Sequence, residues 1–195
     1  MANTYLLSDE AKRYLCCYYQ ILDEMIQGIS AAKLTQSISQ NTIIQLLPHQ
    51  RAAVRLSRNI LEVSNDSAVR RLAQRAAARE TETVEALEAE LADADQLTSP
   101  QMDLRLFQRR AELIFREMYA QMGAVSEGNQ LDALFLRQMI PQRQGAVRAA
   151  RTALQYEVSA GLAPLLRSAI DAQSREIRQM RALLSQRGCQ RCQMA

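Results

Sequence analysis

The sequence contains no tryptophan, a single histidine and few residues that interrupt helices. Its 195 residues include only six glycines and four prolines, and 48% of them are hydrophobic. A chain of this length and hydrophobic content can form one compact core. Because Ala, Leu, Arg, Gln and Glu are abundant, helix is favoured nearly throughout. We therefore expect one all-α domain that spans residues 1–195.

Motifs that carry catalysis are also lacking. No glycine-rich phosphate loop or nucleophile elbow is found, and His49 has no evident nucleophile beside it. A carboxylate-bridged di-iron centre needs Glu-x-x-His pairs on two helices, but the residue three positions before His49 is Leu46. We therefore expect a protein that is not an enzyme.

Long apolar runs are absent as well. The longest uncharged apolar run covers residues 14–22, whereas roughly 18 to 20 residues are needed to span a bilayer. At the N-terminus, Asp9 and Glu10 come before any apolar stretch of signal-peptide length. These features predict a cytoplasmic protein that is not embedded in a membrane and whose cysteines are free thiols.

Basic charge comes almost entirely from arginine and is concentrated in the second half. Residues 1–97 carry 10 basic and 13 acidic groups, whereas residues 98–195 carry 14 and 8. The basic half could contact an anionic partner, either nucleic acid or an acidic protein surface. Arg178 and Arg181, however, share their predicted helix with Glu176, and no aromatic residues are interleaved for base stacking. A solvated helix face is therefore the favoured interpretation, and nucleic-acid binding is not expected.

The sequence contains an internal repeat, in which two similar copies are offset by 93 positions. Residues 42–55 align with residues 135–148 without a gap. Matching pairs include Gln45/Gln138, Pro48/Pro141, Ala53/Ala146, Val54/Val147 and Arg55/Arg148. The two copies cover about residues 9–95 and 102–188. Two long copies favour one fused symmetric body over an open solenoid, which usually needs three or more repeats.

Each copy is predicted to form three helices. In the first copy they begin near Ser8, near Ser39 and after the turn at residues 64–67. In the second copy they cover about residues 104–125, 131–156 and 162–184. The second and third helices of both copies would form a four-helix bundle, with the two first helices packed alongside. The prolines at 48 and 141 should kink or restart the second helices and face each other across the centre.

Three segments of the second copy resemble a known family. They are Phe135-Leu-Arg-Gln-Met-Ile-Pro, Gly145-Ala-Val, and Gln173-x-x-Glu-Ile-x-x-Met180. Together they resemble the ferritin-like domain-of-unknown-function family numbered three hundred and five, over about residues 9–188. The resemblance implies a ferritin-like helical bundle. It also implies a metal centre, copper in some members, built from paired histidines in a Met-Ile-Pro-His-His motif and from nearby methionines.

The expected metal ligands are mostly missing from this chain. His49-Gln50 and Gln142-Arg143 occupy the positions of the two His pairs. Because soft and borderline metals need three or four converging donors, we expect the family's centre to be lost or reduced. The role would then be structural or protein-binding, with no cofactor. The alternative is a protein that binds copper, zinc or a related ion through His49, Met139, Met180, Cys189 and Cys192.

A buried charge pair is the predicted replacement for the metal. Helical spacing places Arg143 on the inward face, and a guanidinium inside a bundle must be paired. We expect Arg143 to reach Glu80 or Glu176. The remaining members of the predicted hydrogen-bonded network are His49, Gln50 and Gln142.

The cysteines occur as two separate pairs. A Cys-x-x-Cys pair such as Cys189 and Cys192 can form half of a zinc site or a redox couple. Cys16 and Cys17 are adjacent on a predicted helix, so their side chains point about 100° apart and would hardly share one metal. The terminal pair is therefore the better soft-metal candidate, and an exposed terminal tail is the other interpretation.

Overall fold

The computed structural model describes residues 6–93 and 97–193, and the side chains of residues 92, 93 and 188–193 are outside that description. Within it the chain forms six α-helices, which confirms the all-α prediction. They are α1 (Asp9–Ser30), α2 (Ile38–Leu61), α3 (Ser67–Asp93), α4 (Gln101–Gly123), α5 (Leu131–Ala153) and α6 (Leu162–Gln193). No helix in this part of the chain is both long enough and apolar enough to cross a bilayer.

Capping residues set several of these helix ends. The side chain of Ser8 accepts a hydrogen bond from the backbone N–H of Ala11, and that of Ser37 accepts one from Gln40. Asp66 accepts two, from the backbone N–H groups of Ala68 and Val69 at the start of α3. Such caps satisfy amide groups that have no partner within the helix.

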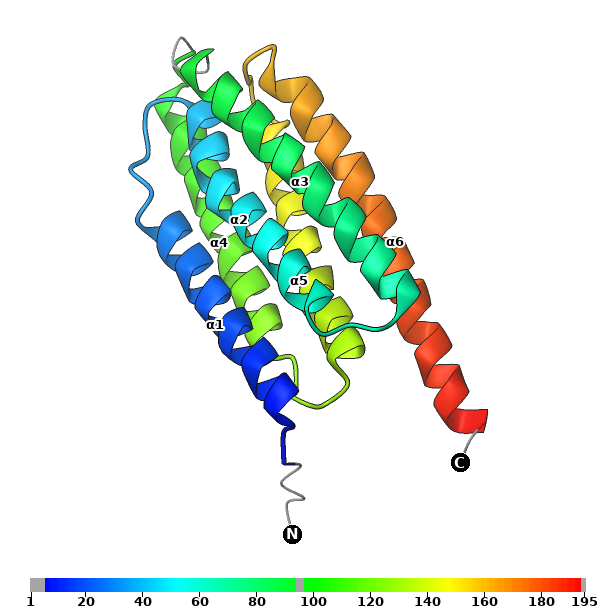
Figure 1. Cartoon of the computed structure of the whole chain (residues 1–195). Helices are drawn as coiled ribbons and strands as arrows, with labels where there is room; N and C mark the ends of the chain where they lie inside the picture. The colour runs from blue at the N-terminus through cyan, green and yellow to red at the C-terminus, as the bar shows by residue number, and fades with distance from the viewer. Residues whose placement is uncertain (1–5, 94–96, 194–195) are drawn as a thin grey trace.

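Helices α2 and α5 occupy the middle of the molecule. Helix α2 contacts α1, α3 and α5, while α5 contacts α4 and α6, and α3 also packs on α6. In Figure 1, α1 and α4 lie to one side of this central pair, and α3 and α6 lie to the other. The predicted bundle of α2, α3, α5 and α6 is therefore present, and α1 and α4 complete a second four-helix group around the same two helices.

The two groups differ in what they bury. Large apolar and aromatic side chains such as Tyr18, Phe115 and Phe135 fill the group that contains α1 and α4. The group that contains α3 and α6 buries apolar residues such as Leu87 and Met180, and it also buries polar residues, including Glu80 and Glu176. The apolar core therefore extends through both groups, and a buried polar cluster interrupts it between α3 and α6.

Neither proline restarts its helix. Pro48 and Pro141 each lie inside one continuous helix, so of the two predicted alternatives, a kink or a restart, the restart is excluded. A proline removes a single backbone donor. Here the turns on both sides of it are buried against neighbouring helices, and this packing maintains the helical course.

Residues 93 positions apart make equivalent contacts. Arg55 on α2 pairs with Glu24 on α1, and Arg148 on α5 pairs with Glu117 on α4. Close packing differs between the copies at one such position. Gly145 on α5 corresponds to an alanine in the first copy, and a Cβ added there would lie 2.4 Å from Met118 Sδ.

This contact predicts the effect of a small substitution. Gly145→Ala should lower the free energy of unfolding by about 1–3 kcal/mol through overpacking, although alanine is intrinsically the better helix former by about 1 kcal/mol. Chemical denaturation measures the change. Gly123→Ala is the control, because a Cβ at Gly123 meets nothing within 4 Å. Equal stability of the two variants would contradict the tight approach of α4 and α5.

Candidate functional site

The site begins with two residues that follow the prolines. His49 on α2 and Gln142 on α5 are both 0% exposed and lie opposite each other across the central helix pair. His49 Nε2 lies 3.0 Å from the backbone oxygen of Gln142, and Gln142 Nε2 lies 3.2 Å from the backbone oxygen of His49. The two residues, 93 positions apart, therefore exchange hydrogen bonds and join α2 to α5.

These contacts determine the tautomer of His49. A backbone carbonyl can only accept, so Nε2 carries the hydrogen and donates to Gln142. Nδ1 is then the acceptor of a hydrogen bond from Gln142 Nε2 at 3.3 Å, and Gln50 Oε1, also 3.3 Å from Nδ1, receives no hydrogen from the ring. Burial, opposed by the bond to Gln142, lowers the pKa of His49 to about 4. The ring is therefore neutral, and both of its nitrogen atoms are engaged.

Arg143, next to Gln142, is fully buried at the centre of the polar cluster. Its Nη1 lies 3.0 Å from Glu80 Oε1 on α3, and its Nε lies 2.9 Å from Glu176 Oε2 on α6. Nη1 also donates to Gln142 Oε1 at 3.2 Å. The sequence offered the two glutamates as alternatives, and the structure places Arg143 between them.

A second arginine balances the charge. Arg79 on α3, which is partly exposed, pairs with Glu176 from the outer side. The cluster therefore contains two arginines and two glutamates, with no net charge. Burial raises the pKa of Glu80, and the neighbouring Arg143 acts against that rise.

Amide groups occupy the repeat-equivalent positions of the Arg143–Glu80 pair. Gln50 lies 93 positions before Arg143, and Gln173 lies 93 positions after Glu80. Gln173 Nε2 lies 3.5 Å from Gln50 Oε1 and 3.3 Å from Glu80 Oε1. Each pair joins the two copies, and the ionic pair corresponds by the repeat to the amide pair.

Two members of this cluster were not predicted. Gln173 could have been found, because it is the repeat partner of Glu80 and both should project into the same space. Arg79 carries no such signal. It precedes Glu80 on α3, and only the observed rotation of the helix shows that it reaches Glu176.

Three of the five predicted metal ligands, His49, Met139 and Met180, lie among the residues whose side chains are described. Met139 and Met180 are fully buried members of the apolar core. Cys189 and Cys192 lie among the residues whose side chains are not described. Within the described residues, no group of three or more His, Cys, Asp or Glu side chains could hold a metal ion. With both nitrogens of His49 bonded and a guanidinium nearby, these central residues do not fit a soft metal.

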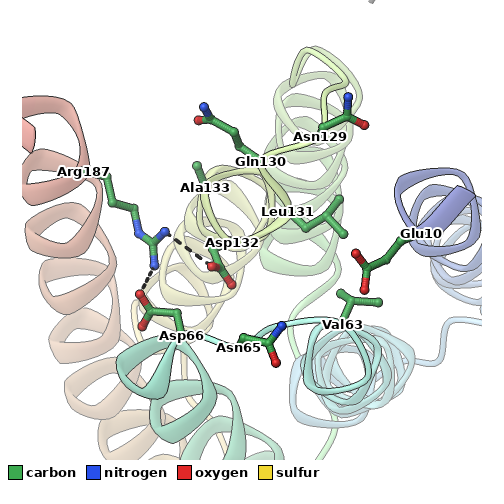
Figure 2. Close-up of a pocket in the computed structure, with 10 residues that line it drawn as sticks. All are labelled: Glu10, Val63, Asn65, Asp66, Asn129, Gln130, Leu131, Asp132, Ala133 and Arg187. Atoms are coloured by element: carbon green, nitrogen blue, oxygen red, sulfur yellow. Dashed lines mark hydrogen bonds and ion pairs between the residues drawn. The ribbon is translucent and has the colours of Figure 1, made fainter. Parts of the chain in front are cut away.

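A surface pocket lies at one end of the bundle, away from this cluster. Figure 2 shows Arg187 of α6 reaching Asp66 and Asp132 at this end, with Glu10 across the pocket. The arginine nitrogens lie 2.6 Å from Asp66 and 3.4 Å from Asp132. The pocket has a volume of about 460 Å³. Because Arg187 joins α6 to the ends of α3 and α5, its evident role is to hold the helices together.

Comparison with known proteins identifies the family. The family model for a domain of unknown function, DUF305, matches residues 40–184. A crystal structure of a DUF305 fragment from Deinococcus radiodurans is similar in fold, with a TM-score of 0.57 and 25% sequence identity. The match covers 76% of this chain and 96% of that one. No curated protein matches. The chain belongs to the DUF305 family, as the sequence resemblance predicted.

The internal repeat suggests how to test the ion pair. Arg143→Gln should lower the free energy of unfolding by about 3–5 kcal/mol, because it leaves buried carboxylate charge without its partner. Adding Glu80→Gln replaces the ion pair with an amide pair like that of Gln50 and Gln173, and it retains Arg79 with Glu176. The double variant should regain all but about 1–2 kcal/mol. Urea unfolding measures both variants.

A surface ion pair provides the control for that experiment. Arg148→Gln breaks the exposed pair with Glu117 and should cost less than about 1 kcal/mol. Two outcomes would contradict a structural role for Arg143: no loss of stability in Arg143→Gln, or an equal loss in the single and double variants.

The buried imidazole makes a separate prediction about pH. Its pKa is about 4 in the folded chain and 6.5 when unperturbed, so between these values the unfolded state binds more protons. Stability should therefore fall as the pH is lowered through this window, with His49 contributing up to about 3 kcal/mol.

His49→Gln isolates that contribution, because His49 is the only histidine. The carboxylates titrate in both proteins, so the difference between the two unfolding curves reports the imidazole. We expect the variant to lose less stability between pH 6.5 and 4. Parallel stability profiles would show that the folded protein does not suppress protonation of His49.

Proposed function

We propose that this chain is a non-enzymatic, ferritin-like helical scaffold whose polar centre stabilises the bundle and whose biological role is binding a protein partner. The observation that carries the proposal is the position of Arg143, which is 0% exposed between Glu80 and Glu176. A guanidinium paired on two sides fills the space between α3, α5 and α6 with the protein's own charges.

The environment of His49 supports a role that is not catalytic. A general base must reach its substrate and have a ring nitrogen free to accept a proton. His49 is 0% exposed, and both ring nitrogens are within hydrogen-bonding distance of neighbouring groups. The same features make it a poor metal ligand, because a ligating imidazole needs an unoccupied lone pair.

The described cysteines are compatible with the proposed cytoplasmic location. Cys16 and Cys17 are both free, and Cys16 is exposed. An exposed free thiol persists most readily in a reducing compartment. We propose that the protein functions there.

Metal loading tests the proposal against its alternative. The purified full chain, without a tag, is loaded separately with Cu(I), Zn(II) and Fe(II) under reducing conditions, desalted and analysed for bound metal. We expect metal well below one equivalent per chain. The reason is that one engaged imidazole and two buried thioethers, Met139 and Met180, do not form a converging donor set.

Two variants locate any metal that is retained. Near-stoichiometric metal that disappears in His49→Ala would contradict the proposal and assign a metal site to the centre. Metal that disappears only in the double variant Cys189→Ser/Cys192→Ser would assign it to the C-terminal pair. Far-ultraviolet circular dichroism of each variant confirms that the fold is retained.

A further inference from the structure

Arginine side chains gather on the face formed by α4, α5 and α6. A groove of about 300 Å³ between α5 and α6 is lined by Arg148, Arg151, Arg178 and Arg181. On the other side of α5, a groove of about 450 Å³ shares Arg148 and Arg151 and adds Arg110 from α4. Among the described residues, no carboxylate lines either groove. We name the surface formed by these five arginines the arginine face.

Most of the positive charge on this face is not neutralised. Arg148 pairs with Glu117, and Arg110 donates to the neutral side chain of Gln155 at 2.7 Å. Arg151, Arg178 and Arg181 are exposed. Within the part of the chain that the structure describes, these three have no hydrogen-bond or ion-pair partner. A cluster of unpaired like charges creates a positive potential that attracts anionic groups.

The first copy shows how the equivalent face is neutralised. The residues 93 positions before Arg148 and Arg151 are also arginines, whereas Glu85 and Glu88 of α3 stand in place of Arg178 and Arg181. There, Arg51 of α2 donates to Glu88 at 2.5 Å. The second copy therefore keeps two arginines of the central helix, has Gln144 in place of Arg51, and carries two more arginines where the third helix of the first copy has glutamates.

The grooves also contain apolar surface that a protein partner can cover. Leu113, which is 47% exposed, lines the groove beside α4, whereas Val147 and Ile177, which line the groove between α5 and α6, are only 7% and 8% exposed. No aromatic side chain among the described residues lines either groove, so the stacking platforms of single-stranded nucleic-acid sites are absent. Arginines bordering apolar side chains are typical of a protein interface, in which arginine is enriched.

We propose that the arginine face binds an acidic helical segment of a protein partner. Its carboxylates would recur every three or four residues, as Glu85 and Glu88 do on α3. They would occupy the positions opposite Arg151, Arg178 and Arg181, which line the groove between α5 and α6. This assignment rests on the proposed protein-binding role and names its surface and partner chemistry.

Peptide binding to the full chain tests the proposal. The probe is a fluorescent, alanine-rich peptide of about 20 residues, long enough to form helix, with glutamates every three or four positions. Fluorescence anisotropy should show binding that weakens with added salt. A peptide with glutamine in place of glutamate should not bind.

A charge reversal suggested by the repeat locates the interaction. Arg178→Glu/Arg181→Glu gives the second copy the residues that the first copy has at these positions. It should weaken the binding at least about tenfold. Arg71→Glu/Arg75→Glu makes the same change in net charge on exposed residues of α3 and should weaken it less than about threefold.

Several results would overturn the assignment. It fails if the glutamate peptide does not bind, or if both double variants weaken binding equally, because the effect would then follow net charge. It also fails if a single-stranded oligonucleotide binds this face more tightly than the peptide. A further contrary result is a chain that self-associates through Arg178 and Arg181 and excludes the peptide, as sedimentation velocity would show. The metal-loading result does not depend on any of these outcomes.

Discussion

The rest of the structure depends on the pairing of one buried guanidinium. Arg143 cannot leave its charge without a partner inside the bundle, so α3 and α6 must each supply a carboxylate at the same depth. That requirement fixes the rotation of both helices relative to α5. Within the described residues, however, Arg143 Nη2 and Glu80 Oε2 have no hydrogen-bond partner. The pair is therefore held largely by charge attraction, and removing either partner would leave an uncompensated buried charge.

The internal repeat shows two solutions to the same packing problem. Two contacts between the copies occupy repeat-equivalent positions, and one pairs Gln50 with Gln173 while the other pairs Arg143 with Glu80. Burying an amide costs less free energy than burying an ion. Removing one partner of a buried ion pair, however, destabilises the fold strongly because it leaves an unpaired charge. The same divergence is seen on the surface, where the carboxylates of α3 correspond to arginines of α6. The two copies therefore share one fold but differ in the charge of equivalent residues, both in the interior and on the surface.

Much of the fold could be predicted from the sequence, because the helical period of apolar residues and the repeat with its offset of 93 can both be recognised in the sequence alone. The inward position of Arg143 followed from the same spacing. Three features did not follow. The continuity of the helices through Pro48 depends on packing by neighbours. The contact of Arg79 with Glu176 depends on how α3 is rotated. The concentration of large apolar side chains beside α1 and α4 depends on which faces meet, and helical period alone does not determine that choice.

The central claim is that the middle of the bundle is closed by its own side chains, with His49 and Gln142 joined by hydrogen bonds and Arg143 paired with two carboxylates. Nitrogen-15 NMR of His49 in the full chain tests it most directly, because the two ring-nitrogen shifts report protonation and tautomer separately. The account predicts a neutral ring with the hydrogen on Nε2, unchanged as the pH is lowered from 6.5 until it approaches about 4. A ring that titrates near 6.5, or that carries its hydrogen on Nδ1, would contradict the exchange of hydrogen bonds between His49 and Gln142.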